Sequence, residues 1–294
     1  VGELFAASPE DTPLLSSIGG LTGGKSINGT EWSWSGFDLR DAEDGRQRTE
    51  GAKAPAFEAR KRFAASNVTE IHQEAVSVSY TRQGATKQVT PAPGSTTVTI
   101  GGTVLPAAEL AFQISSQLKQ IGRDVEKTFI TGKYAKPTDN QTPRKTRGLI
   151  EAIETNVATT THKASELTEA DVVDLIEKVW ASGGLQEGET RTLIVNSTLK
   201  RALTRVFIKE AKYQESSRNV GGVALKAIET DFGSLNIMLN RYVPVDKLIV
   251  VSLEQLSPVF MEIPDKGHFF AEPLAKTGAS DDVQLYGEIG LEYG

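Results

Sequence analysis

The chain has 294 residues, no cysteine and a net charge of −6, with 38 acidic against 32 basic residues. This length suits one large domain or two smaller ones. The lack of cysteine excludes disulfides, thiol nucleophiles and thiolate metal sites. An acidic excess argues against a dedicated nucleic-acid binder, because such proteins use basic residues to displace counterions from phosphate. We find no apolar run near the roughly 18 residues of a membrane span, and no signal peptide.

The first 62 residues predict an arm, a strand and a charged loop. Residues 1–30 are rich in Gly, Ser and Thr, which indicates an extended arm; its first residue, Val1, implies either removal of an initiator Met or cleavage of a precursor. Trp32, Trp34 and Phe37 alternate with serine, as in a strand. Residues 38–62 mix both charges densely. That run is either a solvated loop or a projecting arm that docks on a partner's opposite charges.

A long helix is the strongest signal in the middle of the chain. Strands are expected within 71–81 and at 97–100, and Pro106 then suits a first helical turn. Large apolar residues recur every three or four positions up to Gly132: Leu110, Ile114, Leu118, Ile121, Val125 and Phe129. A helix over 106–132 would be about 39 Å long. We expect it to act as a strut, with Leu118 at the centre of its buried face.

The second half alternates helices and strands. Thr168–Asp171 resembles a capping box, and its helix should bury a face ending in Trp180. A short strand over 192–195 precedes Asn196, the expected cap of a third helix. The remaining expected strands are 223–230, 235–240, 248–253, 259–263 and segments of 268–293. The fold class predicted is α+β.

One motif suggests nucleotide binding. Gly19–Ser26 reads G-G-L-T-G-G-K-S and matches the phosphate-binding P-loop at every specified position. A P-loop needs a buried strand before it and a helix after it, whose amides face the phosphates. Here a turn and an alternating strand follow, so we interpret the motif as part of a glycine-rich arm.

Other candidate sites are weaker. The histidines His72, His162 and His268 lie far apart and form no metal-binding pair. Asp171 fits a helix cap, and the Asp281-Asp282 pair suits a solvated turn better than a calcium site. The tryptophans, including Trp180, are interpreted as core or interface anchors. We therefore expect no catalytic, cofactor or metal site.

Four stretches in the same order resemble the Hong Kong 97-type major capsid (major head) proteins of tailed bacteriophages. They are Asn67–Thr81, the helix Leu110–Phe129 containing Gly122-Arg123-Asp124-Val125-Glu126, the segment Thr146–Asn156, and the C-terminal motifs Glu229–Gly233, Leu274–Gly278 and Gly287-Glu288. Residues 1–66 agree only in character.

The resemblance implies a shell subunit that is not an enzyme. Its expected parts are an N-terminal arm (1–30), an extended loop over a neighbour (31–70), a peripheral domain with the spine helix (71–165), an axial domain (166–263) and C-terminal strands of the peripheral domain (264–294). The intersubunit contacts expected in the loop are Arg46, Arg48, Lys53, Arg60 and Arg62.

The same resemblance implies an icosahedral head enclosing double-stranded DNA without sequence-specific binding. Partners would be hexamers and pentamers of the chain itself, a portal, and scaffolding or protease, with no membrane. The location implied is the virion, after assembly in the bacterial cytoplasm. An encapsulin-like compartment shell is the alternative. Because no asparagine follows Asn240, we expect no lysine–asparagine cross-links from Lys53 or Lys61 to the closing strands.

Overall fold

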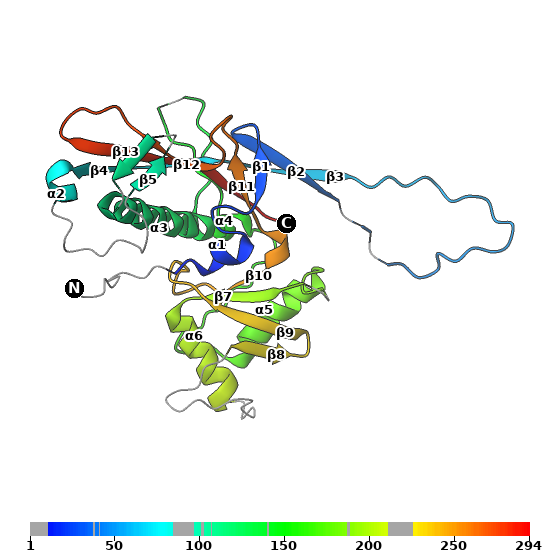
Figure 1. The fold of residues 1–294 in the computed structure, drawn as a ribbon. Coiled ribbons are helices and arrows are strands. Elements are labelled where there is room, and N and C mark those ends of the chain that lie inside the picture. Colours follow the sequence, from blue (N-terminus) through cyan, green and yellow to red (C-terminus); the bar gives the residue numbers. More distant parts are fainter. Residues whose placement is uncertain are drawn as a thin grey trace.

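The computed structural model describes residues 11–37, 39–40, 42–84, 97–100, 103–106, 108–139, 141–186, 189–210 and 226–294. It contains two sheet-based bodies and a long projection (Figure 1). The helices are α1 (Pro13–Ile18), α2 (Tyr80–Gly84), α3 (Ala108–Thr131), α4 (Leu149–Ala152), α5 (Glu169–Ala181) and α6 (Ser197–Thr204), with a π-helical turn over Arg205–Glu210 and a 3-10 turn over Leu253–Gln255. The α+β class is confirmed.

The first body is a sheet that packs on the long helix α3. Its strands run in the order β1 (Lys25–Ile27), β11 (Ser257–Met261), β13 (Ser280–Glu292) and β12 (Phe269–Pro273), and β4 (Glu70–Ser79) also pairs with β13. β13 and β4 are antiparallel over ten residue pairs, from Ser280↔Ser79 to Ile289↔Glu70. The strands at 97–100 and 103–106, β5 and β6, form a separate antiparallel pair.

The second body is a four-stranded sheet in the order β10-β7-β9-β8. These strands are β7 (Arg191–Val195), β8 (Ala227–Thr230), β9 (Gly233–Leu239) and β10 (Ile249–Ser252). Helices α5 and α6 pack against it through a core that includes Ile176, Leu193 and Leu203. Both predicted caps are confirmed: Thr168 and Asp171 form a capping box at α5, and the Asn196 side chain accepts a hydrogen bond from Leu199 N–H at α6.

The spine helix is confirmed over Ala108–Thr131, but its buried face differs from the predicted one. Leu110, Ile121, Val125 and Phe129 are buried as expected, whereas the side chain of Leu118 is 36% exposed. Leu118 was therefore wrongly placed at the centre of the packed face. Pro106 also belongs to β6 and not to the helix. The apolar spacing is correct, but α3 packs on the core mainly through its C-terminal half.

The arm is more ordered than predicted. Within the expected extended arm, Leu14 and Leu15 of α1 are fully or almost fully buried. β1 pairs in parallel with β11, from Lys25↔Val259 to Ile27↔Met261. Residues 11–27 thus complete the core of the first body; the rest of the arm, residues 1–10, lies outside the described residues. None of the helices described here has the length and apolar character needed to cross a membrane.

Candidate intersubunit surface

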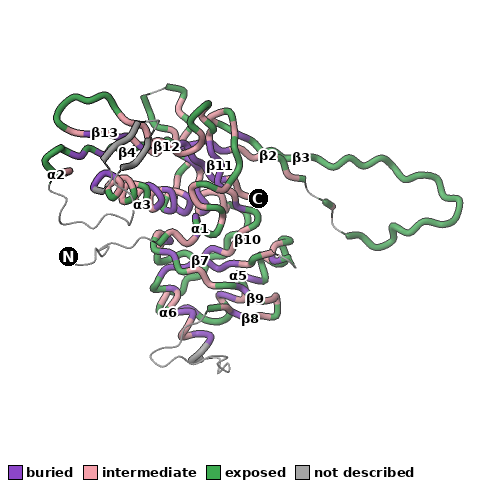
Figure 2. Tube along the Cα trace, viewed as in Figure 1, coloured by how far each residue is buried: buried purple, intermediate pink, exposed green. Residues whose placement is uncertain are grey.

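The projection is an antiparallel ribbon with a long loop at its end. β2 (Glu31–Phe37) pairs with β3 (Arg62–Val68), from Glu31↔Val68 to Phe37↔Arg62. The chain between Phe37 and Arg62 then runs far from both bodies (Figure 1). Nearly all of its described residues are exposed (Figure 2). The charged run was expected to be either a solvated loop or a projecting arm, and this geometry favours the projecting arm.

An aromatic cluster attaches the ribbon to the first body. Trp32 and Trp34 stack with ring centroids 6.2 Å apart, and Trp34 meets Tyr293 edge-on at 5.0 Å. A Cβ on Gly290 would lie only 2.3 Å from the Trp32 ring, so only glycine lets the indole pack so closely against β13. Lys136 Nζ adds an ion pair with Glu31 at 2.6 Å. Trp32 is confirmed as a buried anchor.

Trp180 is not buried, so this part of the prediction is wrong. It lies at the end of α5 with 56% of its surface exposed. Its ring is tilted against that of Phe232, with the ring centroids 5.8 Å apart. On the rest of the predicted face, Val172 and Ile176 are fully buried, whereas Leu175 and Val179 are only partly buried. Trp180 thus extends the apolar surface of the second body instead of filling its core.

The predicted contact residues in the loop fall into two groups. Arg46 pairs with Glu43 at 3.0 Å and with Glu58 at 2.6 Å, and Arg60 pairs with Glu58 at 3.2 Å. Glu58 therefore links the outgoing and returning limbs of the loop.

The remaining predicted cations, Arg48, Lys53 and Arg62, form no ion pair with any other described residue and are exposed. The sequence interpretation also missed Phe57, whose side chain is fully exposed among charged and small neighbours. The sequence does contain an indication of this residue, because Phe57 is a single large apolar residue within a densely charged run.

A buried carboxylate joins three distant segments of the chain. Glu126, on α3, accepts hydrogen bonds from Leu14 N–H at 2.9 Å and Leu15 N–H at 2.6 Å. The same carboxylate accepts one from Nδ2 of Asn240, which follows β9. Burial raises the pKa of Glu126, and the donated hydrogen bonds oppose that rise. The spine helix thereby holds the arm and the second body together.

A second polar cluster fixes the segment that leaves the spine helix. Glu288, on β13, accepts hydrogen bonds from Arg144 Nη2 and from the Tyr286 hydroxyl, both at 2.7 Å, and from Thr69 Oγ1 at 3.0 Å. Nearby, Glu70 accepts from the Thr146 N–H at 3.2 Å. Burial, with the bond to Glu288, raises the pKa of Tyr286 to about 12. These contacts tie residues 144–146 to the main sheet.

The glycine-rich motif has the reverse of P-loop order. Helix α1 precedes it, and Lys25 and Ser26 lie in strand β1 instead of at a helix N-terminus. The Lys25 ammonium pairs with Glu292, and the Ser26 hydroxyl contacts His268. A Cβ on Gly24 would lie 2.3 Å from the carbonyl oxygen of Pro258, so this glycine allows the arm to approach β11. The motif forms a sheet edge.

The other titratable candidates serve structural contacts. His72 contacts Glu70 at 2.8 Å, and His162 contacts Asp171, the α5 cap, at 2.9 Å. Asp281 is buried in strand β13 and pairs with Lys276 at 2.8 Å, so the predicted solvated turn is wrong. Within the described ranges, no three histidine or acidic residues cluster as a metal site would require.

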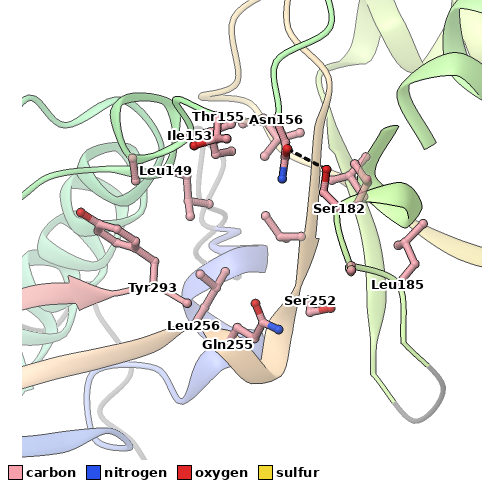
Figure 3. Close-up of a pocket in the computed structure, with 18 of the residues that line it drawn as sticks. Leu149, Ile153, Thr155, Asn156, Ser182, Leu185, Ser252, Gln255, Leu256 and Tyr293 are labelled. Carbon is pink, nitrogen blue, oxygen red and sulfur yellow. Dashed lines mark hydrogen bonds between the residues drawn. The ribbon is translucent and has the colours of Figure 1, made fainter. Parts of the chain in front are cut away.

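A cavity of about 640 Å³ lies between the two bodies. Its walls come from α4 and the segment after it, the end of α5, β10 and the C-terminal residues (Figure 3). Ser182 Oγ donates to Asn156 Oδ1 across one side at 2.9 Å. Among its described lining residues Glu154 is the one charged side chain, so the cavity offers packing surface and not acid–base chemistry.

Comparison with known proteins agrees with this architecture. The family model described as "SU10 major capsid protein" matches residues 1–294. The major capsid protein of Escherichia phage Phieco32 is 33% identical over 125 residues, which cover 42% of this chain and only 30% of that protein.

Solved capsid and shell structures share the fold at low identity. The capsid of cyanophage A-1(L) aligns with a TM-score of 0.64 and 11% identity, over 100% of this chain and 92% of that one. The SrpI encapsulin of Synechococcus elongatus aligns with a TM-score of 0.51 and 9% identity, over 92% and 81%. The Hong Kong 97-type fold is thus confirmed.

Proposed function

The chain belongs to the SU10 major capsid protein family, and we propose that it builds an icosahedral phage head by docking its projecting loop on neighbouring copies. The observation that carries this proposal is the ribbon β2–β3, which is anchored by Trp32 and Trp34 yet buries almost nothing beyond Phe37 on its own subunit. A loop of this kind is stable in extended form when another copy covers it.

In this proposal the two bodies have separate places in a capsomer of five or six copies. The first body, which includes residues 71–165 and 264–294, is the peripheral domain. The expected axial domain, residues 166–263, corresponds to the second body except for β11, which pairs with β13 in the sheet of the first body. Residues 1–30 and 31–70 are the arm and the extended loop. The shell encloses double-stranded DNA without sequence-specific contacts, and it assembles in the host cytoplasm with a portal and a scaffolding or protease component. The chain itself catalyses no reaction.

Removing the loop tests the proposal. Phe37 pairs with Arg62 across the ribbon, so an Asn-Gly turn in place of residues 38–61 can close the hairpin without changing the root. We expect folded subunits, by circular dichroism, that form no shells in electron micrographs. Normal particles from this variant would contradict the role given to the loop.

The predicted contact cations have their own test. Reversing Arg46, Arg48, Arg60 and Arg62 together to glutamate should block assembly and leave the subunit folded, because it breaks the pairs to Glu58 and makes the loop strongly acidic. Single surface ion pairs contribute only about 0–1 kcal/mol, so any one reversal should have little effect.

An encapsulin-like shell is the second candidate, favoured by the shared fold with the SrpI encapsulin. Particles purified from infected cells separate the two functions. A head contains nuclease-protected DNA, whereas a compartment shell contains a cargo protein. A terminase, portal and protease encoded beside the gene would also favour the head.

A further inference from the structure

We propose that the extended loop docks on a second copy of this chain through its apolar side chains, chiefly Phe57 and Leu39, while its ion pairs set the shape of the loop. This inference rests on the proposed function and names the chemistry of that contact. It differs from the sequence interpretation, in which opposite charges carried the docking.

Large apolar side chains are unusually exposed along the projection. Phe57 is fully exposed, Leu39 is 75% exposed, and Phe37 and Phe63 at the end of the ribbon are 63% and 53% exposed. Isolated exposed apolar residues are common on protein surfaces. Here, however, four lie on one projection that extends away from both bodies (Figure 2). Another molecule must therefore cover them if they are to leave water.

Some of the loop charges pair with each other within the loop. Glu58 forms ion pairs with both Arg46 and Arg60. Arg46 also forms an ion pair with Glu43. Residues 38–62 also hold seven basic and six acidic residues, a net charge of +1. A nearly neutral loop exerts little long-range attraction on any partner. Its ion pairs instead hold the two limbs in one arrangement, which lowers the entropic cost of docking.

Magnitudes favour the apolar residues. Burying one large apolar side chain shifts an association equilibrium by roughly 10- to 150-fold, whereas an exposed ion pair contributes about fivefold or less. Phe57 and Leu39 are therefore expected to contribute more to docking than any of the four cations that have no ion pair within the described loop, Arg48, Lys53, Lys61 and Arg62. The occupant is a second copy, because a member of a major capsid protein family meets its own copies on every side of a shell.

Assembly assays with the full chain test the inference. Phe57→Ala should raise the subunit concentration needed for shell formation about tenfold or more. Phe57→Leu keeps a large apolar side chain and should assemble at a concentration close to that of the wild type. Ala56→Ser, the neighbouring exposed position, is the matched control and should assemble like the wild type. Because Phe57 contacts no core, none of these variants should change the Tm of the unassembled subunit.

Salt separates the two kinds of contact. At 1 M salt the screening length falls to about 3 Å, so charge-driven docking would weaken strongly. Apolar docking predicts that wild-type assembly changes less than about threefold between 0.1 and 1 M NaCl. If shells form but Phe57→Ala assembles at the wild-type concentration, or if high salt abolishes assembly, this inference is wrong and the proposed function stands. If the wild type forms no shells at all, the proposed function fails with it.

Discussion

Glu126 offers a direct measure of how firmly the spine helix holds the arm. Its two carboxylate oxygens accept three buried donors, the N–H groups of Leu14 and Leu15 and the amide of Asn240. Glu126→Gln replaces one oxygen with an NH2 group, so at least one buried donor loses its acceptor. An unsatisfied buried donor costs about 1–3 kcal/mol. Glu126→Ala leaves all three donors without a carboxylate acceptor, so it should lower the unfolding free energy by clearly more.

Thermal unfolding of unassembled subunits checks this ranking. At about 2–4 °C per kcal/mol for large domains, Glu126→Gln should lower the Tm by several degrees and Glu126→Ala by more. Asp124→Asn is the matched control, because Asp124 lies on the same helix and only accepts a bond from Gln120 at 3.1 Å. It should leave the Tm nearly unchanged. The reasoning fails if Glu126→Gln is as stable as the wild type.

The pH dependence of stability is a second test of the role of Glu126. Burial raises the pKa of Glu126 above its ordinary value of 4.5, so the folded chain keeps this proton at pH values where the unfolded chain has lost it. The contribution of Glu126 to stability is therefore full below pH 4.5 and falls as pH rises through the raised pKa. Glu126→Gln should lack this component of the slope of Tm against pH.

Three further outcomes follow from buried and exposed contacts. Phe129→Ala, at a fully buried position of α3, should cost the subunit about 3–5 kcal/mol in unfolding free energy, and Leu118→Ala only about 1 kcal/mol; equal losses in denaturant titrations would refute the assigned face. Lys25→Ala should leave assembly intact and reveal no nucleotide affinity to lose, which calorimetry with ATP checks. Tyr286→Phe should flatten the loss of stability between pH 10 and 12, because an unfolded tyrosine ionises near 10 and Tyr286 only near 12.

Features encoded by neighbouring residues could be predicted from the sequence. The caps at Thr168 and Asn196 and the length of the spine helix depend on a few adjacent positions, and the structure confirms them. Spacing alone could not show which part of the stripe is buried, since that depends on the sheet and the arm that cover α3. This is why Leu118 was misplaced.

The arm and the loop show the same limit at longer range. Helix α1 is stabilised by Glu126, more than a hundred residues away, so a glycine-rich composition gave no sign of it. In the loop, the dense charges favoured an electrostatic interpretation in which Phe57 had no role. The loop is nearly neutral and some of its charges pair internally, so these charges are a weak source of docking energy. The family resemblance predicts the projection, but the exposed apolar side chains along it are apparent only in the structure.

The anchoring of the ribbon also orders events during synthesis. Trp32 and Trp34 leave the ribosome early, but the residues they pack on, Gly290 and Tyr293, are more than 250 positions later in the sequence. Contacts between such distant positions form late and slowly. A nascent chain therefore carries an unanchored loop until β13 has been translated and paired. In the proposed assembly, an incomplete subunit cannot present a directed projection, because the ribbon is anchored only when the rest of the protein has been made.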